Sequence, residues 1–511
     1  MKKLISNLGL FTALSAAMVL TASPMYAEDP EFFEEIPLPQ VSEDNPLANQ
    51  IREVLGLTGG TIQTLVPDMR DDGSMSISIV LEGWERTMEL WPHSVVADDF
   101  QVLVPNRVGV FVPIEPPAIH TYRGVLVEDP DTVIAASVID GEVTALVFKP
   151  DRRMLHVQPL RKELPGARAD QHVVFEGSDV ILTPGFCGND DDPNDELRPN
   201  KWVVPNADDV LARDMRPFPD RAEDGGLRVP PDPDFGIGAF VCRVAFDADF
   251  PYYQSNGSSI AATVNDLTGI MNAVNLVYER DTFITHQIGT ILVRTTAGTD
   301  PYSSNDSQVL LGQFRNHWNA NHQGITRDVA HLFTGRNISG SVIGRAFLTV
   351  ICDSVVDGAG YGFSQVTFTT IFARKVALVA HELGHNWSAE HCNQSPNISS
   401  PCNIMCSSID GCDGIGAPEF GPGAINFIQT HAMSRSCLGL GSGVRWLDFS
   451  YNGVFQFGTF FAPYRTLSGA VNATPVDGAI IIKSSSGSAD ITINQPMSIY
   501  TWRGTSNVSA P

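Results

Sequence analysis

Three histidines and a glutamate in the segment 376–392 have the spacing of a metal site. His381 and His385 lie four residues apart, and His391 follows six residues later. Residues four apart on a helix project from one face, so these two imidazoles can reach one metal ion at about 2.0 to 2.1 Å each. Glu382 is adjacent but angularly offset, which favours a base over a further ligand. Three imidazoles leave one tetrahedral position of zinc open, as in catalytic sites.

This arrangement predicts the hydrolysis of peptide bonds. Zinc lowers the pKa of a bound water to about 7, and Glu382 can take the proton of that water and pass it to the leaving amine. The alternative is a core helix that carries satisfied histidines. That reading is disfavoured, because burying three histidines and an acid without a metal would be costly.

A helix must position these residues. Apolar residues at helical spacing predict a core-facing helix that ends near Trp387; they are Phe372, Val376, Val379, Leu383 and Trp387. His391 cannot share the face of His385 if that helix continues. We therefore expect a sharp turn before it, at Ser388 or Ala389.

Downstream, Met405 lies between Cys402 and Cys406 in a short apolar turn. Together with the three histidines it resembles the metzincin metallopeptidases, whose methionine turn lies beneath the zinc. The reprolysin-like (adamalysin/ADAM) family matches best, over about residues 120–440. The segment from His381 to His391 resembles the His-Glu-Leu-Gly-His-Asn-x-Gly-x-x-His of that family.

The resemblance implies an α/β (α+β) catalytic domain with a twisted mixed sheet, an active-site helix and a cleft. It also implies a disulfide between Cys352 and Cys437. The segment Phe186-Cys187-Gly188 resembles a cysteine switch, in which Cys187 would hold the zinc of a latent form. An ordinary disulfide of Cys187, for instance with Cys242, is the alternative.

The chain departs from the family pattern at three places. Ser388 stands where the family has glycine, and a left-handed backbone there would cost a serine about 1 to 2 kcal/mol. Asp328 fits one position of the family's calcium site, but Arg243 stands where an acid is expected, so calcium is not predicted. No dibasic convertase site directly precedes Phe235, so activation would use single arginines or autolysis.

Length and composition predict several folding units and an exported protein. The chain has 511 residues and a net charge of -25, which opposes binding to nucleic acid or anionic lipid. Lys2, Lys3 and the apolar stretch after them predict a cleaved signal peptide over 1–27, with a membrane anchor as the alternative. We expect a secreted protein without a transmembrane anchor, although the periplasm or cell surface remain open.

Export favours disulfides among the eight cysteines. The pairing among four of them is left open; they are Cys392, Cys402, Cys406 and Cys412.

Changes of pattern along the chain predict five segments. The signal peptide is followed by a β-rich propeptide over 28–190, expected to be a domain of its own, with a hairpin at Asp140-Gly141. An acidic linker with prolines and arginines occupies 191–234, and the catalytic domain 235–440. A β-rich module over 441–511 loosely resembles the start of a parallel β-helix. Strands are expected at 241–246, 287–295, 345–352, 479–483 and 490–494, and a helix at 258–280.

The leading hypothesis is a secreted zinc endopeptidase, made as a latent precursor, that acts on proteins or peptides. A catalytically silent binding or adhesion protein of the same fold is the alternative, and the intact Glu382 argues against it. A polysaccharide-active protein would need an acid cluster, which residues 441–511 lack. Contact with a surface or sugar through that module is a further expectation.

Overall fold

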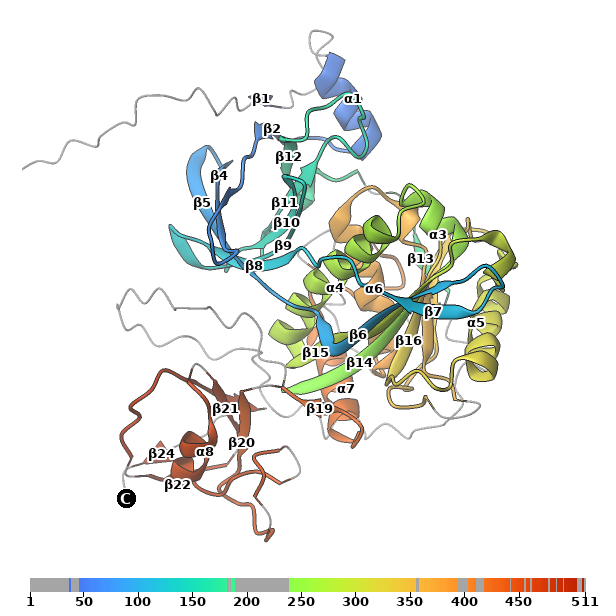
Figure 1. Cartoon of the computed structure of the whole chain (residues 1–511). Helices are drawn as coiled ribbons and strands as arrows, with labels where there is room; N and C mark the ends of the chain where they lie inside the picture. Colours follow the sequence, from blue (N-terminus) through green and yellow to red (C-terminus); the bar gives the residue numbers. More distant parts are fainter. Residues whose placement is uncertain are drawn as a thin grey trace, which may run out of the picture.

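The computed structural model describes residues 36–37, 46–181, 183, 185–188, 239–354, 358–393, 403–409, 418–441, 443–454, 456–459, 462–476, 478–483, 485–489, 491–502 and 508–509. The predicted signal peptide, the predicted linker, Cys402 and Cys412 lie outside these residues. We divide the described chain into an N-terminal region (36–37 and 46–181), a central region (239–440) and a C-terminal region (443–509), which Figure 1 colours blue to teal, green to orange, and red.

A ten-stranded antiparallel sheet forms most of the N-terminal region. Its order is β1-β2-β12-β11-β10-β9-β8-β5-β4-β3. The strands are β1 (Ile36–Pro37), β2 (Thr61–Thr64), β3 (Asp68–Met69), β4 (Met75–Leu81), β5 (Trp84–Pro92), β8 (Thr121–Leu126), β9 (Asp129–Ile139), β10 (Glu142–Phe148), β11 (Met154–Pro159) and β12 (Gln171–Glu176). Helix α1 (Pro46–Leu55) precedes β2, and a short 3₁₀ turn, η1 (Gly177–Asp179), follows β12.

Local sequence explains these strands. Strand β4 alternates buried and half-buried residues, as a sheet with one covered face requires. The predicted hairpin joins β9 to β10, and both turn residues, Asp140 and Gly141, have positive φ values of 52° and 84°. Such a turn matches the twist of paired strands, so this prediction is confirmed.

The central region is built on a nine-stranded mixed sheet in the order β13-β17-β18-β16-β14-β15-β6-β7, with β19 paired to β14. The strands are β6 (Val96–Pro105), β7 (Phe111–Ile114), β13 (Phe186–Cys187), β14 (Phe240–Ala248), β15 (Ile284–Val293), β16 (Val329–Phe333), β17 (Val342–Ala346), β18 (Tyr361–Ser364) and β19 (Gly439–Leu440). The helical elements are α3 (Phe250–Ser255), α4 (Ile260–Thr282), α5 (Ser307–Asn321), α6 (Phe372–Asn386), α7 (Pro422–Met433), η2 (Ala297–Thr299) and η3 (Val366–Phe368).

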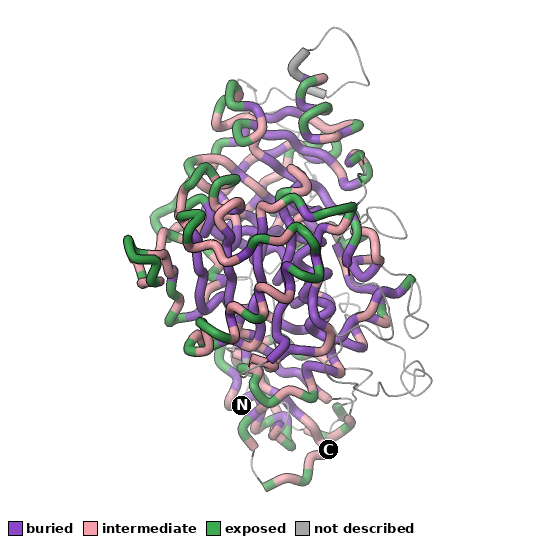
Figure 2. The backbone as a smooth tube through the Cα atoms, turned by 90° about the vertical axis from the view of Figure 1, so that its right-hand side faces the viewer, coloured by how far each residue is buried: buried purple, intermediate pink, exposed green. Residues whose placement is uncertain are grey.

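Helices cover both faces of this sheet. Alternate residues of β14 point to opposite sides: Val244 and Phe246 share one core with α4 and α6, whereas Ala245 shares another core with α5. Buried backbone gathers in the middle of the molecule and continues into the N-terminal region (Figure 2). The expected mixed α/β architecture is confirmed.

Strands β6 and β7 depart from the expected separation of the propeptide. They belong to the N-terminal region in sequence, yet β6 pairs in parallel with β15 and so extends the central sheet (Figure 1). Without β6, the outer edge of β15 would present unpaired backbone groups. The N-terminal region therefore contributes to two sheets.

Most predicted elements of the central and C-terminal regions are present, but two strand predictions are wrong. The strand predicted at 345–352 ends at Ala346, because Thr349 and Cys352 have φ values of 63° and 69° and turn the chain. The strand predicted at 490–494 is absent from the described residues 491–494, which lie between β22 and β23. The predictions at 241–246, 258–280, 287–295 and 479–483 are confirmed within a few residues.

The C-terminal region contains two small parallel sheets, β20-β21-β23 and β22-β24. Its elements are β20 (Val444–Leu447), α8 (Leu467–Ala473), β21 (Ala479–Lys483), β22 (Gly487–Ser488), β23 (Ser498–Trp502) and β24 (Val508–Ser509). The chain passes from β21 to β22 and again from β23 to β24, so successive turns stack in parallel. This pairing is the one expected of a parallel β-helix.

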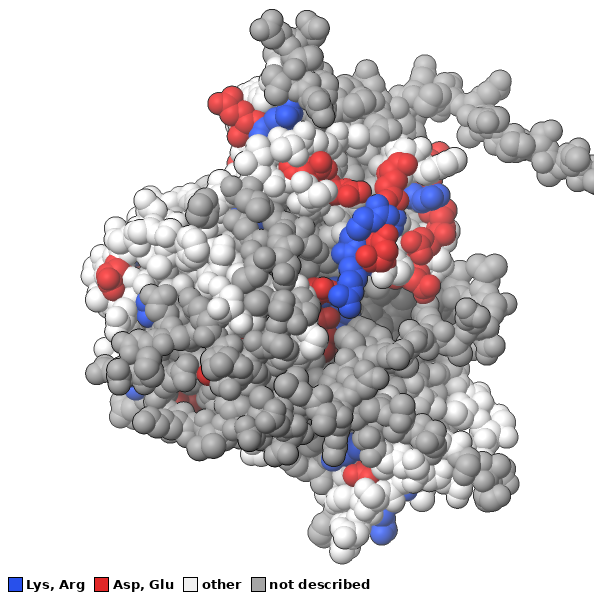
Figure 3. All heavy atoms as spheres, turned by 180° about the vertical axis from the view of Figure 1, so that it is seen from behind, with Lys and Arg blue, Asp and Glu red and all other residues white. Residues whose placement is uncertain are grey.

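Basic and acidic side chains lie intermixed on the face shown in Figure 3. Among the ion pairs of the described residues, Lys149 and Arg153 both pair with Glu82. Among the described residues, no helix is long and apolar enough to cross a membrane.

Candidate metal centre and active site

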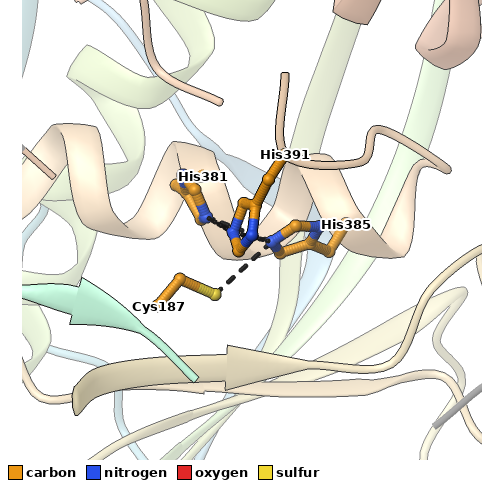
Figure 4. A group of neighbouring side chains, drawn as sticks. All are labelled: Cys187, His381, His385 and His391. Atoms are coloured by element: carbon orange, nitrogen blue, oxygen red, sulfur yellow. Dashed lines mark hydrogen bonds between the residues drawn. The ribbon is translucent and has the colours of Figure 1, made fainter. Parts of the chain in front are cut away.

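The three histidines converge on one point (Figure 4). The Nε2 atoms of His381 and His385 are 3.0 Å apart, and each lies 3.1 Å from Nε2 of His391. Helix α6 supplies the first two rings, and the chain just beyond it supplies the third. All three residues are buried, each with 1% of its surface exposed.

The outer ring nitrogens set the tautomers of two histidines. His381 Nδ1 lies 2.6 Å from the carbonyl oxygen of Ile404, and His385 Nδ1 lies 2.7 Å from that of Ala389. A carbonyl oxygen only accepts hydrogen bonds, so both Nδ1 atoms carry the proton and both Nε2 atoms present a lone pair. Burial, and then the neighbouring His391, lowers the pKa of His381 to about 3, which keeps its ring neutral.

These residues fit a metal ion. Two lone pairs that face each other at 3.0 Å inside the protein repel unless a cation lies between them. Neutral imidazole nitrogens whose other nitrogen donates to a carbonyl are the usual metal-ligand arrangement, and three of them suit zinc. Cys187, His381, His385 and His391 place one ligand atom each within 4.8 Å of one another.

Glu382 lies beside this group and is fully buried. Its Oε2 atom lies 3.6 Å from Cys187 Sγ, and its Oε1 atom has no hydrogen-bond partner among the described residues. Burial raises the pKa of Glu382 to about 8, although the contact with Cys187 and the charge of Arg345 act in the opposite direction. A buried carboxyl with a pKa near neutrality suits proton transfer.

Gly344 of β17 allows Glu382 its position. A Cβ atom at residue 344 would lie 2.3 Å from Glu382 Oε1, so any side chain there would displace the carboxylate. The sequence analysis did not assign a role to Gly344. An isolated glycine inside a strand is a sign of such a close approach.

Cys187 reaches the same point from the N-terminal side of the chain. Its Sγ atom lies 3.4 Å from His385 Nε2 (Figure 4). The short strand β13 holds it there: Gly188 N donates to Gly344 O at 2.8 Å, and Cys187 N donates to Ser407 O at 3.0 Å. Cys187 and Cys242 are both thiols, so the alternative disulfide between them is not formed.

The turn that brings in His391 follows α6 directly. Trp387 caps the helix, and Ser388 has a φ value of 88°, in the left-handed region. Ala389 N then donates to Gly384 O at 2.8 Å. The predicted turn is confirmed, and Ser388 adopts a left-handed conformation that glycine would adopt without strain.

Met405 is fully buried against α6. A Cβ atom at Gly384 would lie 2.7 Å from its sulfur, so the methionine packs directly under the turn of helix that carries His385. The same segment provides the Ile404 carbonyl for His381. Carbonyl partners such as this one could not be identified from side-chain patterns.

The disulfide predicted from the resemblance can be compared with the structure. Cys352 and Cys437 are bridged, as expected. Cys392 and Cys406 are each disulfide-bonded as well.

Near the first bridge, Asp328 Oδ2 accepts a hydrogen bond from Arg243 N at 2.7 Å, and burial raises the pKa of Asp328 to about 6.

Comparison with known proteins gives one family. The model described as Metallo-peptidase family M12 (Reprolysin_5) matches residues 239–427, which include the three histidines, Glu382 and Met405. This match supports a metallopeptidase and suggests zinc-dependent proteolysis.

Two solved structures show distant likeness only. The crystal structure of metalloproteinase-II from Bacteroides fragilis is 13% identical, with a TM-score of 0.38, and the match covers 70% of this chain and 91% of that one. A chaperone–substrate complex is 15% identical, with a TM-score of 0.29, and the match covers 38% of this chain and 34% of that one.

Proposed function

We propose that the protein is a secreted zinc endopeptidase made as a latent precursor. The convergence of three Nε2 atoms beside a buried glutamate carries this proposal. His381, His385 and His391 would hold the zinc, and Cys187 would occupy its remaining position in the latent form. Secretion rests on the sequence of residues 1–27.

Each protein group has a defined part in the reaction. Zinc, when bound, lowers the pKa of a coordinated water to about 7 and polarises the substrate carbonyl. Glu382 accepts the proton of the attacking water at its carboxylate and returns it to the leaving amine nitrogen. Ile404 and Ala389 hold two of the imidazoles in the required tautomer through their carbonyl oxygens. Met405 and Gly344 fix the helix and the carboxylate.

The edge strand β17 offers a binding site for an extended peptide. One side of β17 pairs with β18, and its other side pairs only with the short strand β13 among the described residues. A peptide that replaces β13 would gain the same backbone hydrogen bonds and pass next to Glu382. The Cys187 segment would therefore block both the metal site and the edge of β17 where a substrate peptide would bind.

The test uses the full chain with a specific protease recognition sequence inserted between Gly188 and Ala239, called here the cleavable chain. Casein hydrolysis and zinc content are measured before and after cutting, with and without Cys187→Ser. We expect about one zinc ion per chain. Casein hydrolysis should rise roughly tenfold or more when the chain is cut or Cys187 is replaced. The control, Glu382→Gln, should lower activity by about 10² to 10⁴ while zinc stays bound.

Two results would count against the proposal. Zinc without proteolysis of several protein substrates would favour the silent binding protein. Absence of zinc from all forms would refute the metal site itself.

A further inference from the structure

The N-terminal region shares one hydrophobic core with the central region. Buried residues of the former pack in the same cluster as residues of α4 and α6, such as Val274 and Leu378. The contributing residues are Val95, Val102, Ala135, Leu146, Phe148 and Met154. Because these side chains are buried in a core that both regions build, separating the regions would expose apolar surface on both.

A buried polar network crosses the same interface. Arg123 of β8 donates to Asn272 Oδ1 at 2.7 Å and pairs with Glu279 at 3.3 Å; both residues lie on α4. The side chains of this ion pair are only 1% and 2% exposed. Asn272 donates in turn to the carbonyl oxygens of Tyr122 and Ala136. Removing one partner from such a network leaves a buried group unpaired, which is strongly destabilising.

The N-terminal region also caps the helix of the candidate active site. Ile371, the residue before α6, provides no side-chain cap. Instead, Gln158 of β11 accepts a hydrogen bond from Phe372 N at 2.9 Å and donates to Thr370 O at 3.1 Å. Ile371 itself is buried in a core with Leu160 and Leu164. The start of the helix that bears His381 is therefore fixed by the N-terminal region.

Strand β6 completes the interface at the far edge of the central sheet. It pairs with β15 from Val96 to Leu103, and Asp99 of this strand forms an ion pair with Arg243 of β14 at 2.7 Å. These contacts lie on the opposite side of the sheet order from β17.

Residues 185–188, which carry Cys187 and are called here the blocking segment, are held by a much smaller interface than the N-terminal region. Strand β13 has only two residues, of which Phe186 is exposed and Cys187 is buried. Residues 185–188 pair with β17 and also form backbone hydrogen bonds with Ser341, Gly344, Ser407 and Ile409. Release of this segment breaks local hydrogen bonds and the contacts of Cys187, whereas release of the N-terminal region disrupts a hydrophobic core.

We propose that the N-terminal region is a permanent part of the active molecule. After the chain is cut between Gly188 and Ala239, residues 46–181 stay bound to the central region, and only the Cys187 segment leaves the site. The active form is then a complex of two polypeptides. The association rests on the contacts above; its role in activity rests on the proposed function.

The cleavable chain tests this directly. After complete cutting, the two pieces are applied to gel filtration at micromolar concentration in native buffer, and each fraction is analysed for both pieces and for casein hydrolysis. We expect the pieces to elute together, with all activity in that peak. Pieces that elute together without proteolysis would refute the proposed function but support the association.

A matched pair of variants links the association to the interface. Arg123→Ala, made in the cleavable chain, should raise the fraction of separated pieces by roughly tenfold or more, because Glu279 loses its buried partner. Arg70→Ala is the control, since Arg70 pairs with Glu89 inside the N-terminal region. It should leave the elution unchanged. If Arg123→Ala does not fold, the wild-type elution alone decides.

Separate elution of the wild-type pieces, or precipitation of either piece after cutting, overturns the proposal. Full activity of an isolated central piece would also overturn it.

Discussion

At the scale of single residues, the site depends on backbone positions as much as on ligands. Ser388 holds a φ value of 88°, and Gly344 leaves room for Glu382. Neither residue would bind the metal. Each sets where a functional side chain lies, so each can be tested without removing a ligand.

Ser388→Gly should give a protein that is more stable than Ser388→Ala by about 1 kcal/mol, because only glycine adopts a left-handed backbone without strain. Both variants lose the hydrogen bond between Thr349 Oγ1 and Ser388 Oγ, so the comparison isolates the backbone. Urea unfolding of the two variants measures the difference. Equal stability would show that the turn is not strained.

Gly344→Ala should lower kcat by about tenfold or more, because the new methyl group displaces the carboxylate of Glu382 from its catalytic position. Gly312→Ala on α5 is the matched control, since a Cβ atom there meets nothing within 4 Å. Steady-state kinetics and zinc content are measured for both. A fully active Gly344→Ala would argue against a catalytic role for the present position of Glu382.

At the scale of elements, the turn after β17 forms hydrogen bonds with the C-terminal end of α6. Thr349 N donates to His385 O at 3.0 Å, and Val350 N donates to Asn386 O at 2.9 Å. The disulfide of Cys352 fastens this turn to Cys437, which precedes β19 and lies 85 residues away in sequence. The bridge thus joins the turn beneath the site to the end of the central region.

Replacing both Cys352 and Cys437 by alanine should lower the free energy of unfolding by about 2 to 5 kcal/mol, because the unfolded chain loses a long closed loop. Cys242→Ala, which removes a buried thiol from β14, should cost only about 1 kcal/mol. Denaturant midpoints of the two variants test this. A similar loss in both would mean that the bridge adds nothing beyond packing.

At the scale of the whole molecule, buried neutral histidines make folding sensitive to acid. Burial lowers the pKa of His156 to about 3, and its two ring nitrogens are buried without a hydrogen-bond partner in the described chain. Burial also lowers the pKa of His286 and of His331 to about 3. The unfolded chain binds protons at these positions below about pH 6.5 and the folded chain does not. The contribution of these histidines to stability is therefore full above about pH 6.5 and falls toward pH 3.

His156→Phe should weaken this pH dependence, because phenylalanine keeps the stacking on Phe175 and removes the titrating ring. For wild type, His156 alone should cost about 2 kcal/mol at pH 5 relative to pH 7. Urea unfolding at both pH values gives the slope for each protein. An identical slope in the variant would contradict the assigned burial of His156.

Local patterns in the sequence were enough to identify the candidate site. Helical spacing placed His381 and His385 on one face, and the need for a turn placed the irregular backbone at Ser388 or Ala389. These are properties of residues close together in sequence, so they can be predicted without knowledge of the fold. The strand predicted at 345–352 failed for the opposite reason: hydrogen bonds that it donates to carbonyl oxygens of α6, and a disulfide to Cys437, turn this apolar segment.

The sequence by itself determined the candidate ligand set, the helix that carries it, the hairpin at Asp140-Gly141 and the mixed α/β class. Only the tertiary structure decided that β6 joins the central sheet, that Gln158 caps α6, and that Gly344 accommodates Glu382. Each of these contacts joins residues tens to hundreds of positions apart. Spacing along the chain encodes which face a side chain occupies, but the partner across that face is set only when distant elements pack together.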